Sequence, residues 1–242
     1  MAHPALQMAV RLVYPPRCTL CGAPVADDFG LCGPCWRDTP FITGLVCDLC
    51  GIPLPGESSA EVHCDECLSI ARPWSRGRAA LRYEANGRRL VLALKHGDRH
   101  DAARPAGKWL ARAAAPLLAP GTIISPVPLH WMRLLSRRFN QSALLARALA
   151  RETGLAFVPD LLIRHRQTQS LKGLDRAARH ATLDGAIRAN PRHLATLRGA
   201  RLILVDDVMT SGATLSAATQ AAQAAGAEDV CILALARAEK GP

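Results

Sequence analysis

Two acidic residues stand side by side in a chain that carries a formal net charge of +10. Asp206 and Asp207 follow the apolar run RLILV, and small residues come soon after them: Thr210, Ser211, Gly212, Ala213 and Thr214. In open α/β sheets, ligands bind beyond the carboxyl ends of the strands. The N–H groups of a small-residue loop, with the positive end of the helix predicted after it, suit a phosphate monoester. Carboxylates accept hydrogen bonds from hydroxyls instead, so the stretch predicts a ribose 5-phosphate site.

Two other interpretations of this stretch stay open. Asp206 could merely cap the strand and residues 210–214 could merely cap the helix. Capping would need only one acid and one hydroxyl residue, however, and this stretch has more of both. Acids also end strands in nucleotide sites of the Walker type, but the chain has no GxxxxGK[ST] segment.

Eight of the nine cysteines form four Cys-x-x-Cys pairs near the N-terminus. Two such turns can direct four thiolates at one tetrahedral zinc ion. We predict two structural zinc ions, each held by consecutive pairs: Cys18, Cys21, Cys32 and Cys35, then Cys47, Cys50, Cys64 and Cys67. A cross-braced pairing, a redox dithiol and an iron–sulfur centre are the alternatives. The segment has few large apolar residues, so its folding is expected to depend on the metal.

The charge is distributed unevenly along the chain. Residues 1–70 hold three Lys/Arg against eight Asp/Glu, whereas residues 71–192 hold twenty-three against seven. Four thiolates around a zinc ion make a dianion, which adds to the acidity of the first segment. Phosphate binding needs a positive surface. The cysteine-rich segment is therefore expected to brace the rest of the chain or to dock a protein partner.

Beyond Pro73 the pattern alternates between apolar strands and amphipathic helices. Strands are predicted at residues 77–84, 122–128, 161–164, 201–205 and 229–236, and helices at 87–97, 108–119, 139–154 and 215–226. Such alternation predicts an α/β fold with a mostly parallel sheet. The ninth cysteine, Cys231, is expected to be a buried core thiol. We predict two domains, a double zinc ribbon at 1–72 and an α/β domain at 73–242.

Longer stretches resemble a known family. VDDVMTSGAT (205–214) resembles the phosphoribosyl pyrophosphate (PRPP) motif of type I phosphoribosyltransferases. Residues 125–150, 94–101 and 164–187 are similar to blocks of the ComF family, a competence-associated group with a double zinc ribbon ahead of a phosphoribosyltransferase fold. The resemblance implies that fold here, with a type I phosphoribosyltransferase-like, mostly parallel sheet.

The resemblance also implies roles for individual residues. Asp206 and Asp207 would hold the ribose hydroxyls, and the PRPP-binding stretch would run on through Val208, Met209, Thr210, Ser211, Gly212, Ala213 and Thr214. A second group would bind pyrophosphate or close over PRPP as a mobile loop: Val127, Pro128, Arg133, Arg137 or Arg138, Arg164, Arg166 and Lys172. Mg²⁺ would be held mainly by pyrophosphate and ribose oxygens.

The family resemblance implies a function in DNA uptake, in which the protein would bind single-stranded DNA or a DNA-translocation helicase. The basic residues of 71–192 favour it. Aromatic residues are only 4% of the chain, so we expect sequence-blind binding without base stacking. The alternative is an active phosphoribosyltransferase that moves ribose 5-phosphate to a nucleobase-like acceptor, although no segment predicts an acceptor site. A third alternative is a ligand-sensing regulator of the same fold, but the sequence shows no helix-turn-helix segment for such a role.

The sequence also predicts the compartment. The apolar stretches are shorter than the roughly 20 residues that cross a bilayer. The N-terminal apolar run is interrupted by Arg11 and lacks a small-residue cleavage pattern, so no signal peptide is expected. We therefore expect a cytoplasmic protein without membrane insertion.

Overall fold

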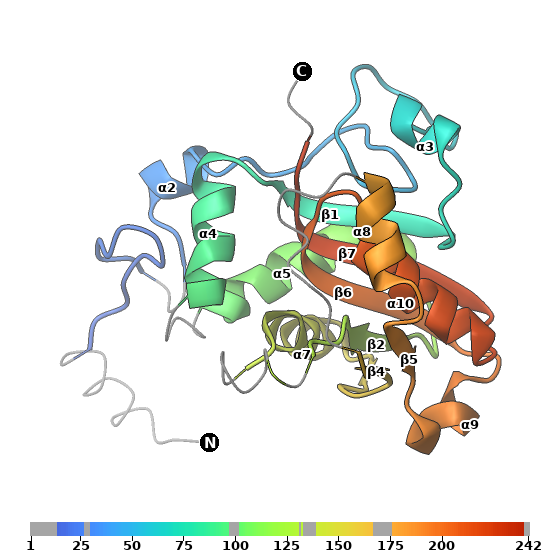
Figure 1. Ribbon diagram of the computed structural model, residues 1–242. Coiled ribbons are helices and arrows are strands. Elements are labelled where there is room, and N and C mark those ends of the chain that lie inside the picture. Colours follow the sequence, from blue (N-terminus) through green and yellow to red (C-terminus); the bar gives the residue numbers. More distant parts are fainter. Residues whose placement is uncertain are drawn as a thin grey trace.

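A computed structural model describes residues 14–26, 30–96, 102–130, 132, 139–166 and 176–239 (Figure 1). Its main sheet has five strands, all parallel, in the order β1-β7-β6-β2-β3. These strands are β1 (Arg76–Arg82), β2 (Ile123–Pro126), β3 (Ala156–Phe157), β6 (Arg201–Met209) and β7 (Asp229–Arg237). The predicted α/β fold with a mostly parallel sheet is confirmed.

Helices cover both faces of this sheet (Figure 1). One face carries α4 (Ala85–His96), α5 (Ala103–Ala114) with the 3₁₀ turn η2 (Ala115–Leu117), and α7 (Gln141–Thr153). The other face carries α10 (Ala213–Ala224). The central strand β6 alternates between the two cores because successive side chains of a strand point to opposite faces. Ile203 and Val205 face α5 and α7, whereas Leu202 and Leu204 face α10.

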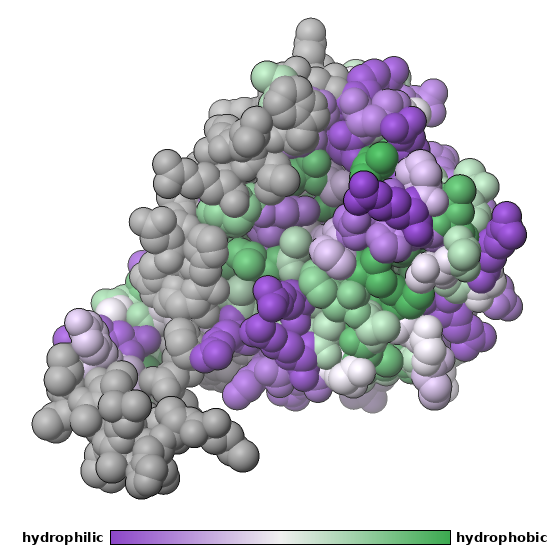
Figure 2. All heavy atoms as spheres, turned by 90° about the horizontal axis from the view of Figure 1, so that it is seen from below, coloured by the Kyte–Doolittle hydropathy of each residue, from purple (hydrophilic) through white to green (hydrophobic). Residues whose placement is uncertain are grey.

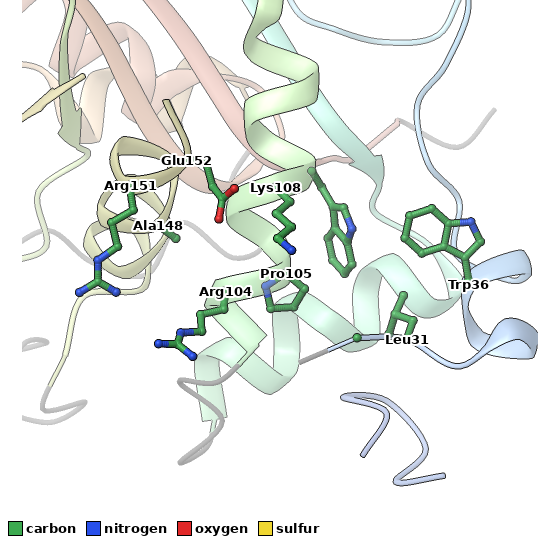
Figure 3. A pocket seen from close by; sticks show the side chains of 10 residues that line it. Leu31, Trp36, Arg104, Pro105, Lys108, Ala148, Arg151 and Glu152 are labelled. Carbon is green, nitrogen blue, oxygen red and sulfur yellow. The ribbon is translucent and has the colours of Figure 1, made fainter. Parts of the chain in front are cut away.

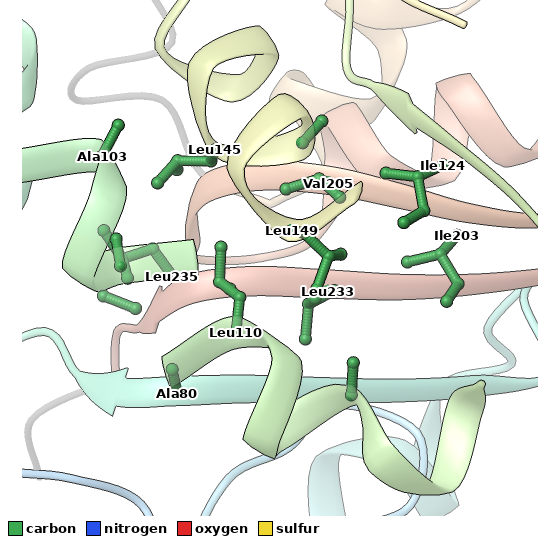
Figure 4. Close-up of a cluster of buried hydrophobic side chains, with 14 of the residues drawn as sticks. Ala80, Ala103, Leu110, Ile124, Leu145, Leu149, Ile203, Val205, Leu233 and Leu235 are labelled. Atoms are coloured by element: carbon green, nitrogen blue, oxygen red, sulfur yellow. The ribbon is translucent and has the colours of Figure 1, made fainter. Parts of the chain in front are cut away.

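The core between the sheet and α5/α7 is made of aliphatic side chains (Figure 4). Leucines of the two helices and of β7 meet there: Leu110, Leu145, Leu149, Leu233 and Leu235. All five are fully buried. Gly107 of α5 lies so close to Ala148 of α7 that an added Cβ would come within 2.8 Å of the alanine Cβ. The two helices therefore pack in direct contact.

A smaller antiparallel sheet lies apart from the main one. It consists of β4 (Leu162–Arg164) and β5 (Ile187–Ala189). The sequence predicts a strand at 161–164 but assigns it to the main sheet, and β5 was not predicted because three residues carry too short a pattern. Three further short elements belong to this part of the chain: α8 (Arg176–Leu183), η3 (Pro191–His193) and α9 (Leu194–Leu197).

The cysteine-rich segment contains two short helices, α2 (Gly33–Arg37) and α3 (Asp65–Ser69). Its backbone bonds directly to the edge strand β1. The Ile42 N–H donates to the Ala80 carbonyl at 2.9 Å, and the Gly77 N–H donates to the Asp48 carbonyl at 2.7 Å. These bonds cover an edge that would otherwise expose unpaired backbone groups. The prediction that this segment braces the rest of the chain thus has a structural basis.

Two predicted elements differ from the structure by more than two residues. The strand expected at 201–205 continues to Met209, because β6 stays paired with β7 as far as the Met209↔Arg237 pair. The acidic pair therefore lies inside a strand and not beyond its end. Helix α5 begins at Ala103 and not at 108, since Pro105 lies in its first turn, where proline is tolerated.

Among the described residues, the helices are all too short or too polar to span a membrane. Figure 2 shows hydrophilic side chains gathered in the middle of the face seen from below, on the side where α7 lies in Figure 1. Cys231 is buried in β7, in line with its expected place in the core.

Candidate functional site

The acidic pair is held by the first turn of α7. Asp206 Oδ1 accepts hydrogen bonds from Ser142 Oγ at 2.8 Å and from the Asp207 N–H at 2.9 Å. Asn140 caps α7 by accepting from the Ser142 N–H at 3.0 Å, and its amide donates to the Val127 carbonyl at 3.1 Å. The Asn-Gln-Ser turn thus joins the end of β2 to the acidic pair.

The two carboxylates have different surroundings. Burial, together with the negative charge of Asp207, raises the pKa of Asp206 to about 7. Asp207 Oδ2 lies 3.2 Å from Lys95 Nζ of α4. Lys95 is not among the site residues that the sequence predicts. Its position at the end of a helix, in a segment that resembles a family block, is the only signal that marks it.

The segment after the acids forms a tight turn into α10. Gly212 is the N-cap of that helix with φ +80°, and it offers no side-chain acceptor to the first-turn N–H groups. A Cβ at this position would lie 2.9 Å from the ring of Trp74. The Ala213 N–H donates to Ser211 Oγ at 3.5 Å. First-turn N–H groups have no acceptor inside the helix, so those that follow Ala213 can bind an anion.

A small hollow lies over this turn. Its lining comes from Asp206, residues 208–215 and Arg179 of α8, and its volume is about 50 Å³. Arg179 Nη1 lies 3.5 Å from Thr210 Oγ1. This space holds a group the size of one small anion, since a single water needs about 10–15 Å³ on this measure.

Two buried arginines hold the same loop from behind. Arg72 donates to the Ser211 carbonyl at 2.8 Å, and Arg237 donates to the Met209 and Thr210 carbonyls at 3.2 and 2.8 Å. Three consecutive loop carbonyls, those of residues 209–211, are thereby engaged by buried guanidinium groups. The side chains of Arg72 and Arg237 are only 1% and 2% exposed, so their charges act through little water.

Glu66 links both arginines to the cysteine-rich segment. Its carboxylate lies 3.6 Å from Arg72 Nη2 and 3.2 Å from Arg237 Nη2. Glu66 stands in α3 directly before Cys67. Trp74 adds a further tie, because its indole N–H donates to the Leu49 carbonyl at 2.6 Å. The loop after β6 therefore rests on the second cysteine cluster.

The eight paired cysteines form two clusters of four. Cys18, Cys21, Cys32 and Cys35 make the first, and Cys47, Cys50, Cys64 and Cys67 make the second, with the sulfurs of each within 4.8 Å of one another. Sulfur atoms 2.3 Å from a shared tetrahedral zinc lie about 3.8 Å apart. The Cys21–Cys32 and Cys50–Cys64 sulfurs are 3.5 and 3.7 Å apart. Both clusters fit a structural zinc ion.

The clusters confirm the predicted sequential pairing. The cross-braced alternative is wrong, because each cluster combines neighbouring Cys-x-x-Cys turns. All nine cysteines are free of disulfides. Burial raises the pKa of the Cys67 thiol, and Arg72 opposes this rise. The hydrogen bond with Cys47, followed by burial, raises the pKa of the Cys50 thiol, and Arg237 opposes that rise. The same two arginines thus serve the second cluster and the loop.

The remaining predicted site residues are spread more widely. The Val127 N–H donates to the Val205 carbonyl, so the 127–128 turn lies beside β6. Arg164 is nearly buried in β4, and exposed Arg166 donates to the Asp184 carbonyl. Their closure over PRPP stays a prediction. Four residues lie outside the described part of the chain: Arg133, Arg137, Arg138 and Lys172.

Comparisons with known proteins agree with this architecture. Residues 9–68 match the double zinc ribbon domain family, and residues 140–242 match the phosphoribosyl transferase domain family. The chain is 32% identical to the "DNA utilization protein YhgH" of Salmonella typhimurium over 233 residues, which cover 93% of this chain and 99% of the relative.

Two further relatives cover most of the chain. The protein of the same name from Escherichia coli K12 is 30% identical over 93% of this chain and 99% of its own length. The "Competence protein F" of Haemophilus influenzae is 28% identical over 86% of this chain and 91% of its own length. With a double zinc ribbon, a phosphoribosyltransferase domain and full-length relatives of this kind, the chain belongs to the ComF family.

Proposed function

We propose that this protein binds PRPP with Mg²⁺ in the hollow at the end of β6. The observation that supports the proposal is that the acids and the loop offer different binding groups. Asp206 and Asp207 offer carboxylate oxygens for the ribose 2- and 3-hydroxyls, while the turn at residues 210–214 offers N–H groups to the 5-phosphate. The hollow accepts one phosphate-sized group, as this assignment requires.

The charges around the hollow support the same assignment. Arg179 lies beside Thr210, and the buried Arg72 and Arg237 lie beneath the loop, so three cations surround the 5-phosphate position. Lys95 offsets part of the negative charge of the acidic pair. The pyrophosphate of PRPP would lie on the side of the 127–128 turn. Mg²⁺ would be held mainly by ligand oxygens and would neutralise the pyrophosphate charge.

Calorimetry of the zinc-loaded protein with PRPP and Mg²⁺ tests this proposal. We expect a dissociation constant in the micromolar to millimolar range, and at least tenfold weaker binding for Asp207→Ala, since a charge-assisted hydrogen bond contributes roughly 1.5–3 kcal/mol. Glu228→Gln, at an exposed acid near β7, is the matched control and should bind like wild type. Equal binding by wild type and Asp207→Ala would exclude the proposed site.

We further propose that the PRPP site serves a role in the use or uptake of DNA, in the cytoplasm. The names of the relatives, DNA utilization protein and competence protein, support this role. The excess of cations in residues 71–192 suits contact with single-stranded DNA or with a helicase that carries it. The proposal also keeps the two predicted domains, a double zinc ribbon at 1–72 and a phosphoribosyltransferase-like domain at 73–242. A gene deletion complemented with Asp206→Ala/Asp207→Ala tests whether DNA uptake needs the acidic pair.

Phosphoribosyl transfer is the second candidate, and one observation favours it. A carboxyl group with a pKa of about 7, such as Asp206, can exchange protons near neutral pH, as groups at catalytic sites do. In the reaction, an acceptor nitrogen would bond to the anomeric carbon while pyrophosphate leaves with the bonding electrons, and the acceptor's proton would pass to a base. Pyrophosphate release from PRPP with a panel of nucleobases tests it. Release without dependence on any base would contradict transfer.

A further inference from the structure

A second and larger hollow lies between the first cysteine cluster and the helices α5 and α7. Its volume is about 530 Å³. Two tryptophans and four charged residues contribute to its lining: Trp36, Trp109, Arg104, Lys108, Arg151 and Glu152. Figure 3 shows Trp36 on one side of the hollow, Arg104 and Arg151 on the other, and Lys108 between them. The aromatic and the basic side chains are thus separated across one cavity.

The aromatic side of the hollow is held rigidly by its neighbours. The centroid of the Trp36 ring lies 4.5 Å from that of Phe41 and 6.4 Å from that of Trp109. The Phe41 and Trp109 rings pack edge-on, with their centroids 5.4 Å apart. Although it packs in this cluster, Trp36 stays 48% exposed. Its backbone is fixed because it follows Cys35, a member of the first cluster. A fixed and half-exposed indole offers a stacking surface at little cost in side-chain entropy.

The basic side combines rows of cations from two helices. On α5, Arg104, Lys108 and Arg112 are all exposed and stand four residues apart, so they share one face. On α7, the exposed Arg147 and Arg151 have the same spacing. The Gly107–Ala148 contact draws the two helices together. Five cations therefore lie on one pair of packed helices, and among the described residues that line the hollow the one acid is Glu152.

We propose that this hollow and the helix faces beside it bind single-stranded DNA. One base would stack on Trp36, and the phosphates on either side of it would contact the cations of α5 and α7. Grooves that bind single strands combine these two features, and every base has a face that can stack. A zinc ion held by the first cluster leaves four thiolates with a net negative charge at the aromatic side, which directs the phosphates to the helices.

This inference rests on the DNA-handling part of the proposed function and assigns it a surface separate from the PRPP site. It differs from the expectation of binding without base stacking, which rested on composition alone. Low aromatic content argues against base stacking only when the aromatic residues are scattered, and here two tryptophans and a phenylalanine gather beside basic side chains. Binding should still be insensitive to base sequence, because stacking and phosphate contacts carry no sequence code.

A fluorescence titration of full-length, zinc-loaded protein with a labelled oligothymidylate tests the site. We expect Trp36→Ala to weaken binding by roughly 5- to 100-fold, which is the usual effect of losing one stacking partner. Trp36→Phe keeps an aromatic face and should recover most of the affinity. Zinc content and far-ultraviolet circular dichroism report whether Trp36→Ala stays folded, and Trp36→Phe keeps the test valid if it does not.

The basic side is tested with Lys108→Gln and Arg151→Gln, which change exposed side chains and spare the core. Each should weaken binding and lower the slope of log affinity against log salt by about 0.7, the value for one phosphate contact with a single strand. Arg201→Gln is the matched control, because Arg201 is exposed at the far end of β6. Unchanged affinity and salt slope in both Lys108→Gln and Arg151→Gln would overturn the assignment.

Three competitors identify the ligand class. An abasic oligonucleotide should compete more weakly than oligothymidylate, since it has phosphates without bases, and thymidine monophosphate should compete weakly because it makes few phosphate contacts. Polyglutamate competing as well as the oligonucleotide would point to an acidic protein partner and overturn the proposal. If all the variants of the hollow bind DNA as tightly as wild type, the proposed surface is wrong, although the protein could still contact DNA elsewhere. Absence of DNA binding in wild type would refute DNA contact altogether, while PRPP calorimetry on the same samples judges the PRPP site independently.

Discussion

Glu66, the residue before Cys67, lies 3.2 Å from Arg237, the last residue of β7, and Arg237 in turn donates to the Thr210 carbonyl at 2.8 Å. A chain of direct contacts therefore runs from a predicted zinc site to a predicted phosphate loop. Because Arg237 is only 2% exposed, this chain is shielded from water and salt. The zinc ribbon thus acts as a structural support of the candidate PRPP site.

Replacing Arg237 tests this support. Arg237→Met removes two hydrogen bonds to loop carbonyls and a positive charge beneath the 5-phosphate position, and it leaves Glu66 without its nearer partner. We expect a loss of roughly 3–5 kcal/mol in the free energy of unfolding, the usual effect of breaking a buried ion pair. PRPP affinity should also fall in calorimetry.

Arg237→Lys separates charge from geometry, because lysine keeps the charge but lacks the planar set of donors. The free energy of unfolding and the PRPP affinity of Arg237→Lys should lie between those of Arg237→Met and of wild type. Wild-type PRPP affinity in a folded Arg237→Met protein would show that the loop does not depend on this contact.

The two cysteine clusters should differ in their effect on PRPP binding. Cys64→Ser disturbs the second cluster, which supports the loop through Glu66, whereas Cys21→Ser disturbs the first, whose Trp36 borders the other hollow. We expect each variant to lose one equivalent of zinc in a chelator assay. Cys64→Ser should then bind PRPP more weakly than Cys21→Ser does. Equal PRPP affinities in two variants with the expected zinc content would contradict the specific link.

Gly212 is expected to tolerate no side chain. Its φ of +80° disfavours any L-residue by roughly 1–2 kcal/mol, and a Cβ would also meet the Trp74 ring at 2.9 Å. Gly212→Ala should therefore lower both the melting temperature and the PRPP affinity. Gly154→Ala is the matched control, since Gly154 has a φ of +71° with open space around its Cβ position. It should lose stability from the backbone alone and bind PRPP normally. A melting temperature for Gly212→Ala no lower than that of Gly154→Ala would show that the crowding at Trp74 has no effect.

The sequence predicted those parts of the molecule in which spacing and chemistry point to one arrangement. The Cys-x-x-Cys pairs predicted both clusters, because turns of this kind direct neighbouring thiolates at one ion. The alternation of strands and helices predicted the parallel sheet. The acids at 206–207 and the small residues after them predicted a ribose 5-phosphate site, which stays a prediction, and a small hollow lined by Asp206 and residues 208–215 lies there.

Other parts depend on contacts between distant residues and left no local pattern. Glu66 of α3, Arg72 of the segment before β1 and Arg237 of β7 meet only in the folded chain. The hollow beside Trp36 forms where a cysteine turn approaches α5 and α7, so no single segment marks it. Strand β6 runs past its apolar core to Met209 because β7 continues to pair with it, and a pattern of apolar residues alone ends at Val205.

Asp206 should make the stability of the fold depend on pH. In the folded chain, burial and the charge of Asp207 raise the pKa of Asp206 to about 7, whereas the unfolded chain releases this proton near the ordinary value of 3.8. As the pH rises between these values, the unfolded state gives up the proton first. The raised pKa therefore lowers the free energy of unfolding progressively from about pH 4 to pH 7, and the penalty stays constant above that range.

Asp206→Asn removes this titration and keeps the size of the side chain. We expect the variant to gain stability over wild type as the pH rises, by roughly 1–4 kcal/mol at pH 8 compared with pH 4. Chemical denaturation of both proteins across this range measures the difference, and the shared zinc clusters cancel because their own pH dependence affects both proteins equally. A difference in unfolding free energy that does not change with pH would mean that Asp206 titrates normally. The acidic pair would then be ionised throughout at neutral pH, and each carboxylate could accept hydrogen bonds from a ribose without first losing a proton.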